Sequence, residues 1–142
     1  MKITDANIKI IKDSRNKDTL EAEMRTENFL ALASAPSGKS RGVHEAFVLD
    51  SKMAAAKFEE IKGKILEESA NRRINSQEEF DNFLISLDGT PDKSNLGGNL
   101  TLVLSLAFAR LKAKTEGKEL FQYIKEILNL KSQIFRGRFS TL

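Results

Sequence analysis

Residues 19–33 read TLEAEMRTENFLALA, and this stretch decides the class of fold. Over residues 19–24, Thr and Glu alternate with Leu, Ala and Met, the period of two that is typical of a strand with one wet and one buried face. A second apolar run covers residues 29–33, and the four polar residues between the two runs suit a hairpin connection. We therefore predict two neighbouring antiparallel strands here.

A third strand is expected before them, where isoleucine occupies positions 8, 10 and 11. From Ser51 onward the apolar spacing becomes helical. The apolar stripe of the first predicted helix is Met53, Ala56, Phe58, Ile61 and Ile65. Ser76 and Glu79 form a capping box at the start of a second helix. A long helix is predicted from about Asn95 to Gly117, and the last helix has the stripe Leu120, Tyr123, Ile124 and Ile127.

Strands followed by helices are the order of an α+β domain. We predict a three-stranded antiparallel sheet followed by about four helices, which pack on one face of the sheet. The 142 residues are long enough for one domain with a real core, and we place that domain at residues 1–129.

The composition narrows the function classes. Apolar residues make up 40% and charged residues 30%, and Lys and acids are interleaved at a net charge of +3, which argues against a nucleic-acid surface. The absence of Cys excludes disulfides, a thiolate nucleophile and sulfur-ligated metals. The N-terminus has no signal-peptide pattern, and the longest apolar stretch is too short to span a bilayer. We expect a cytoplasmic protein without a nucleic-acid or membrane partner.

Residues 37–42, SGKSRG, have the ingredients of an oxyanion-binding loop. Glycines permit close approach of the backbone, hydroxyls donate or ligate, and cations neutralise charge. The spacing is not that of a phosphate-binding Walker loop, and a plain surface loop with solvated Lys39 and Arg41 is the alternative. His44 and Glu45 could be a base and its partner, but a lone histidine is more often structural. From residue chemistry alone, the chain lacks a complete catalytic set.

Three segments carry a family resemblance. Residues 13–15 (DSR), with Thr19 and Glu21, are similar to a DSRGNPTVE motif. Residues 35–46 (APSGKSRGVHEA) are similar to VPSGASTGxxEA, and residues 87–107 are similar to LDGTxxKSxLGANAxLxVSLA. In this order and spacing, residues 5–129 resemble the N-terminal domain of enolase (phosphopyruvate hydratase). The family's N-terminal domain is three strands followed by helices, which agrees with the elements predicted above.

The resemblance implies a role for the loop. In enolases this loop is a mobile lid over the active site, and its second serine, here Ser40, ligates the magnesium that arrives with the substrate. Oxygen ligands suit a hard cation, and a closing loop can complete the shell and expel water. The lid residues implied here are Ser37, Gly38, Lys39, Ser40, Arg41, Gly42, His44 and Glu45. Arg15 and Glu21 match positions at or near the dimer contact of the family.

The same resemblance implies that the chemistry needs another domain. The family dehydrates 2-phosphoglycerate, a phosphorylated three-carbon acid, to phosphoenolpyruvate in glycolysis, and its lysine base, glutamate acid and magnesium-binding carboxylates lie on a C-terminal barrel. A barrel needs far more residues than follow residue 129. We therefore expect no catalytic residue in this chain, inactivity alone, and a partner that is an enolase barrel or a second enolase-like subunit. The alternative is a stand-alone module that binds a phosphorylated ligand or a protein through Lys39 and Arg41.

The chain departs from the family pattern in several places. Residues 16–18 (NKD) replace Gly-Asn-Pro, Lys39 and Arg41 add charge to the lid, and Gly98 replaces an alanine. Residues 130–142 form a divergent tail that fits neither the family pattern nor a helix end. With suitably chosen codons, another reading frame of the same nucleotides can encode a stretch that resembles the opening of the enolase barrel. Our hypothesis is that this tail is the frameshifted start of the missing barrel.

Overall fold

The computed structural model describes residues 1–35 and 48–129. The elements are β1 (Asp5–Lys12), β2 (Asp18–Arg25), β3 (Leu30–Ser34), α1 (Ser51–Ala70), α2 (Gln77–Asp88) and α3 (Gly98–Thr115). A further helix covers residues 120–129. Within the described residues, three antiparallel strands are thus followed by four helices, and the predicted α+β class is confirmed.

The sheet has the order β1-β2-β3, and both strand pairs are antiparallel. The alternation predicted for β2 is confirmed over residues 20–24, where Leu20, Ala22 and Met24 are fully buried and Glu21 and Glu23 lie on the outer face. It is wrong for Thr19, which is buried at 8% exposure because its hydroxyl bonds to the Ala35 carbonyl. The third strand begins at residue 30 rather than 29. Phe29 instead closes the turn, where its carbonyl accepts a hydrogen bond from the Thr26 N–H at 2.9 Å.

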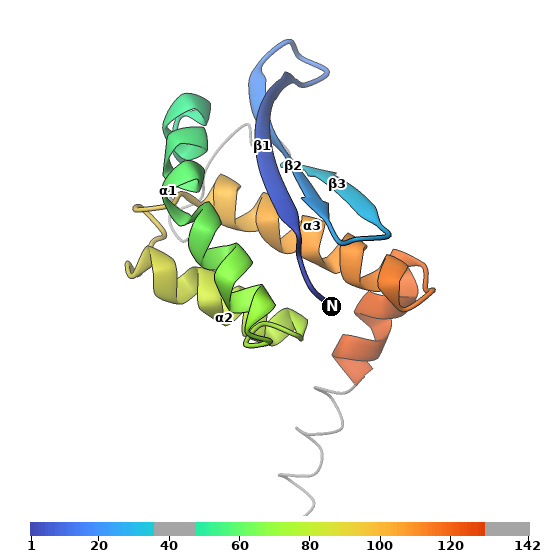
Figure 1. The fold of residues 1–142 in the computed structure, drawn as a ribbon. Helices are drawn as coiled ribbons and strands as arrows, with labels where there is room; N and C mark the ends of the chain where they lie inside the picture. Colours follow the sequence, from blue (N-terminus) through green and yellow to red (C-terminus); the bar gives the residue numbers. More distant parts are fainter. Residues whose placement is uncertain (36–47, 130–142) are drawn as a thin grey trace, which may run out of the picture.

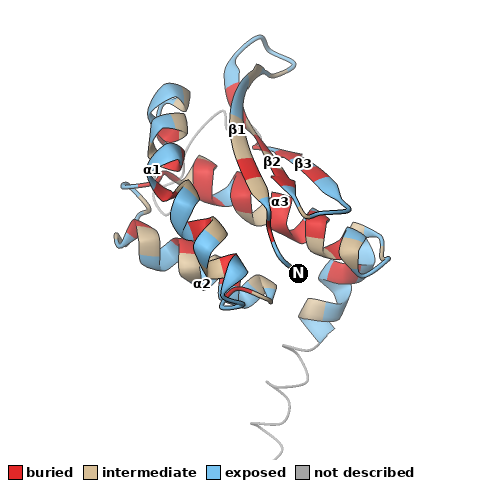
Figure 2. Cartoon of the chain, in the orientation of Figure 1, coloured by how far each residue is buried: buried red, intermediate tan, exposed pale blue. Residues whose placement is uncertain are grey.

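The helices cover the inner face of the sheet and the side of β1 (Figure 1). α3 lies across β2 and β3, α1 packs along β1, and α2 packs on α3. The buried residues gather where these elements meet, and the outer surfaces of α1 and α2 are exposed (Figure 2). At the centre the rings of Phe80 from α2 and Phe108 from α3 stack with their centroids 4.4 Å apart.

The predicted apolar stripe of α1 is wrong at its start. Met53 is 56% exposed and Ala56 is also exposed, whereas the face that packs on the sheet begins at Ala54 and continues through Phe58, Ile61 and Ile65. The physical reason is the phase of the helix. Spacings of four, three and four residues follow one face of a helix, and Met53 does not share that face with Phe58.

Both ends of the long helix α3 are set by glycines. It begins at Gly98, three residues later than predicted, because residues 90–96 form a turn. It ends at Thr115, and Gly117, with a φ of 68°, takes the predicted C′ position after the C-cap Glu116. There the Gly117 N–H donates to the Lys114 carbonyl and the Lys118 N–H to the Ala113 carbonyl, the two bonds of a Schellman motif.

The helix 120–129 is attached to the body by Tyr123, which is 5% exposed. Its hydroxyl donates to Gln77 Oε1 at 3.1 Å, and the Gln77 amide donates in turn to Asp81 and Ser105. Ile124, predicted to belong to the apolar stripe, is 40% exposed. None of the helices in the described ranges combines the length and apolar character needed to cross a bilayer.

Candidate functional site

The predicted lid lies outside the described residues. This holds for all eight lid positions, Ser37, Gly38, Lys39, Ser40, Arg41, Gly42, His44 and Glu45. The tail at residues 130–142 lies outside them as well. The structure does describe the residues at which segment 36–47 enters and leaves the fold, Ala35 and Val48. The candidate site is therefore built from the two ends of this segment and from what holds them.

The N-terminal end of the segment is held by β2. Ala35 is 2% exposed, and its N–H donates to the Leu20 carbonyl at 3.0 Å. The Ala35 carbonyl accepts a hydrogen bond of 2.6 Å from Thr19 Oγ1, and Thr19 is itself 8% exposed. Both backbone groups of Ala35 are thus paired with the central strand, which fixes the point where the segment leaves the sheet.

The C-terminal end is held by α3. The side-chain amide of Asn99 accepts a hydrogen bond from the Leu49 N–H at 3.2 Å and donates to the Leu49 carbonyl at 3.0 Å. The next residue, Asp50, is the N-cap of α1, and its carboxylate accepts from the Lys52 N–H at 2.9 Å. Leu49 therefore lies between two fixed helix starts.

The loop between α2 and α3 is organised by Asp88, which is 3% exposed. One carboxylate oxygen accepts from the Leu96 N–H at 2.7 Å, and the other accepts from the N–H and the hydroxyl of Thr90. Burial raises the pKa of Asp88, but these hydrogen bonds outweigh it and hold the pKa below the usual value. Asp88 is thus an ionised structural group that shapes the loop leading to Gly97 and Asn99.

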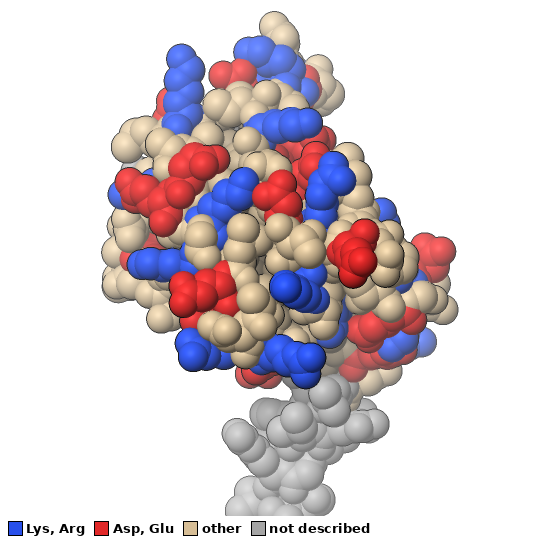
Figure 3. All heavy atoms as spheres, viewed as in Figure 1, with Lys and Arg blue, Asp and Glu red and all other residues tan. Residues whose placement is uncertain are grey.

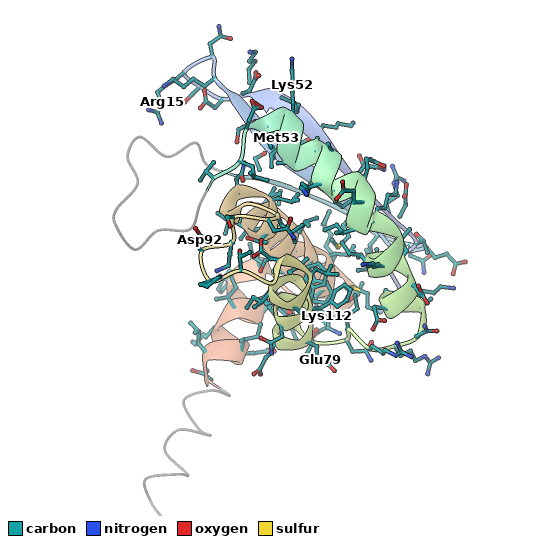
Figure 4. All side chains as sticks on the ribbon, turned by 90° about the vertical axis from the view of Figure 1, so that its left-hand side faces the viewer. Arg15, Lys52, Met53, Glu79, Asp92 and Lys112 are labelled. Atoms are coloured by element: carbon teal, nitrogen blue, oxygen red, sulfur yellow. The ribbon has the colours of Figure 1, made fainter. Side chains whose placement is uncertain are left out.

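Arg15 and Glu21, the predicted dimer-contact residues, both belong to the β1–β2 hairpin. Arg15 lies in its turn, at the same end of the molecule as Lys52 and Met53 at the start of α1 (Figure 4). The Asp13 carboxylate shapes this turn by accepting from the Arg15 N–H at 2.8 Å. Glu21 lies further along β2, opposite Lys9 of β1 in the strand register. Arg15 and Glu21 therefore occupy different parts of one hairpin.

Cations and acids are interleaved on the surface, as the sequence predicts. Figure 3 shows both signs mixed over one face of the molecule. On the outer face of the sheet, Glu23 lies 2.9 Å from the Arg25 guanidinium and 3.9 Å from the Lys9 ammonium. Such pairing leaves short-range ion pairs rather than a field of one sign on this part of the sheet.

The groups with shifted pKa values in the described residues are poorly suited to proton transfer at neutral pH. Hydrogen bonds from nearby N–H donors lower the pKa of the Asp5 and Glu79 carboxyls, and the pKa of Asp88 is lowered too. A hydrogen bond to a glutamate carboxylate raises the pKa of Lys118, and burial raises that of Tyr123. Every shift moves the group away from neutrality, the opposite of what a general acid or base needs.

No cluster of metal ligands is found in the part of the chain that the structure describes. Within residues 1–35 and 48–129, no three His, Cys, Asp or Glu side chains come together in a way that could hold an ion. The expected ligand Ser40 lies outside that part of the chain.

Sequence reasoning missed the residues that hold the ends of the segment. The sequence suggests for Asn99 a closely packed helix start or an anion site, and for Thr19 the wet face of a strand and a match to the family motif; neither predicts a contact with the ends of the segment. The available signal was weak: Asn99 matches an asparagine of the enolase motif, but the motif does not say that its amide reaches Leu49, 50 residues earlier.

Comparison with known proteins identifies the family. Residues 3–124 match the model of the enolase N-terminal domain family. The chain is also 38% identical over 133 residues to Enolase 1 of Chlorobaculum tepidum, an alignment that covers 87% of this chain and 31% of that protein. The chain belongs to the enolase N-terminal domain family, and it spans about a third of the length of this curated relative.

Proposed function

We propose that the chain serves as the capping domain of an enolase, a magnesium-dependent lyase that dehydrates 2-phosphoglycerate to phosphoenolpyruvate in glycolysis. The observation that carries the proposal is the 38% identity over 133 residues to one part of a curated enolase. The aligned part makes up 31% of that protein, so the proposal assigns the proton-transfer groups to a separate barrel. The chain alone is then inactive.

In this proposal the lid is segment 36–47. Ser40 supplies one oxygen ligand for magnesium, since hard cations prefer oxygen, and Lys39 and Arg41 add positive charge beside the substrate phosphate. His44 and Glu45, in the same segment, are the further lid residues of this proposal. The proposal is supported by the fixed ends of the segment, because Ala35 is hydrogen-bonded to β2 and Leu49 to α3.

The proposed partner is an enolase barrel, either as a domain or as part of a second enolase-like subunit. Arg15 and Glu21 contribute to a homodimer contact, and the site of action is the cytoplasm. The domain occupies residues 1–129, and residues 130–142 form a separate tail. Sequencing the encoding DNA tests whether this tail is a frameshifted barrel start, because the alternative frame must then encode a barrel-like sequence.

The test is a coupled assay of 2-phosphoglycerate dehydration with the chain mixed with a separately produced enolase barrel. We expect turnover in the mixture and none with the chain alone. Ser40→Ala should lower turnover in the mixture by at least about tenfold, since it removes a metal ligand. Ser34→Ala, an exposed serine of β3, is the matched control and should leave turnover unchanged.

Two results would argue against the proposal. A mixture without turnover, while each component is folded, would contradict the capping role. Titration of the chain alone with phosphoglycerate and magnesium provides the second: tight binding without any barrel would favour the stand-alone binding module.

A further inference from the structure

We infer that Asn99 is a positioning residue for segment 36–47: its side-chain amide holds the C-terminal end of the segment at Leu49. The inference rests on the proposed function for what the segment does. The contact itself lies entirely within the described residues, as two hydrogen bonds of 3.2 and 3.0 Å between Asn99 and Leu49.

The chemistry of this contact requires an amide. One side chain must accept from a backbone N–H and donate to the carbonyl of the same residue, as a neighbouring strand would do. Asparagine carries both an acceptor oxygen and an NH₂ donor. A carboxylate at position 99 keeps the shape and the acceptor but loses the donor, and places negative charge beside the Leu49 carbonyl.

The packing under Leu49 supports the same role. Leu49 is 8% exposed and lies directly over Gly97. A Cβ at position 97 would lie 2.9 Å from Leu49 Cγ and 3.1 Å from its Cβ. The Leu49 side chain can therefore pack in this position only because residue 97 is glycine. Hydrogen bonds from Asn99 and packing on Gly97 thus act on the same residue from the first turn of α3.

This contact determines how firmly the two ends of segment 36–47 are held. Ala35 is held by Thr19 and Leu20 at one end, and Leu49 by Asn99 at the other. Val48, the described residue before Leu49, is 45% exposed. Loss of the Asn99 contact leaves Leu49 held by its packing on Gly97 alone, so this end of the segment is held less firmly. A site whose supporting contacts are weakened is positioned less accurately.

The first test measures cleavage of the folded chain by trypsin at Lys39 and Arg41. The variants are Asn99→Asp, which removes the donor alone, and Asn99→Leu, which removes both hydrogen bonds. The control is Ser76→Ala, which removes the α2 cap far from the segment. Each protein is digested at the same interval below its own Tm, so that global unfolding contributes equally. We expect cleavage at these two bonds at least about fivefold faster in both Asn99 variants, and within about twofold of the parent chain in Ser76→Ala.

The second test is the kcat/KM of the mixture with an enolase barrel. Asn99→Asp should lower kcat/KM about tenfold, whereas Ser76→Ala should leave it unchanged. The proposed function is tested separately, by whether the unmodified chain and the barrel are active together. If the parent mixture is active and Asn99→Asp equals Ser76→Ala in both cleavage and kcat/KM, the inference alone is overturned.

If the Asn99 variants do not fold, the contact can still be tested on the parent chain by hydrogen exchange. The contact predicts that the Leu49 amide exchanges with solvent at least about 100-fold more slowly than an unprotected amide. Exchange of the Leu49 amide at the unprotected rate would overturn the inference.

Discussion

The backbone at Gly97 has a φ of 88°, and a Cβ there would lie 2.7 Å from Asn99 Oδ1 and 2.9 Å from Leu49 Cγ. Gly97→Ala therefore combines backbone strain with a steric clash, and we expect a loss of about 2 kcal/mol in the free energy of unfolding. Chemical denaturation with urea measures this loss. The matched control is Gly63→Ala in α1, where a Cβ has no neighbour within 4 Å.

Gly63→Ala should stabilise the chain by about 0.5–1 kcal/mol, because alanine is the better helix former in an open position. A Gly97→Ala variant as stable as the parent chain would show that Leu49 and Asn99 can move aside at no cost. That result would contradict the close packing of Leu49 on Gly97.

The buried carboxylate of Asp88 makes a second prediction at this scale. Asp88→Asn replaces an acceptor-only group by an amide whose NH₂ must face the N–H of either Thr90 or Leu96, two donors that now bind different carboxylate oxygens. We expect a loss of about 2–3 kcal/mol in the free energy of unfolding at neutral pH. Thermal or urea denaturation of both proteins measures it.

The pH dependence follows from the lowered pKa of Asp88. A carboxyl whose pKa is lower in the folded state contributes stability above its unfolded pKa of about 3.9, and this contribution is lost as the pH falls through the folded value. The parent chain should therefore lose more stability on acidification below about pH 4 than Asp88→Asn does. Equal acid dependence of the two proteins would contradict the ionised, hydrogen-bonded state of Asp88.

These residues also show what a sequence can predict at this scale. Asp88 and Gly89 are recognisable as a helix stop, and Gly89 indeed has the left-handed backbone of a C-cap. The partners of the Asp88 carboxylate and of the Asn99 amide are not recognisable. They depend on how two loops meet in space, which no local pattern encodes.

At the scale of elements, the helix 120–129 is attached through the single tyrosine of the chain, which makes it measurable. Burial, with the negative charges of Glu116 and Asp81, raises the pKa of Tyr123 above its ordinary value of about 10. Tyrosinate absorbance should therefore appear only well above pH 10 while the chain remains folded. In urea it should appear near pH 10.

The sign of the stability effect is fixed by the same shift. A tyrosine whose pKa is raised in the folded state favours the unfolded state once the pH exceeds about 10, so the free energy of unfolding should fall above that pH. An ionisation midpoint near 10 in the folded chain, with unchanged circular dichroism, would mean that Tyr123 is not buried against α2 and α3.

The elements themselves were largely predictable because their patterns are local. The alternation in β2 and the capping box of Ser76 and Glu79 were predicted and are present in the structure. The start of α1 was predicted wrongly, because Met53 and Ala54 are both apolar and Met53 was assigned to the buried face. The spacing to Phe58 and Ile61 places Ala54 on that face, so here the error lay in the choice of helical phase.

For the whole molecule, the candidate site was less predictable than the fold. Residue chemistry alone identified SGKSRG as an anion-binding loop or a plain surface loop, and only the family resemblance assigned it to a lid. The described structure contributes the fixed ends of that segment. The proposed roles of Ser40, Lys39 and Arg41 rest on that resemblance.

The central claim is our proposal that this chain caps an enolase site whose proton-transfer groups lie on a separate barrel. The most direct measurement supplies the purified chain alone with 2-phosphoglycerate and magnesium and follows the formation of phosphoenolpyruvate. We predict no product above the rate of a sample without protein. Steady turnover by the chain alone, proportional to its concentration and free of contaminating enolase, would contradict the claim.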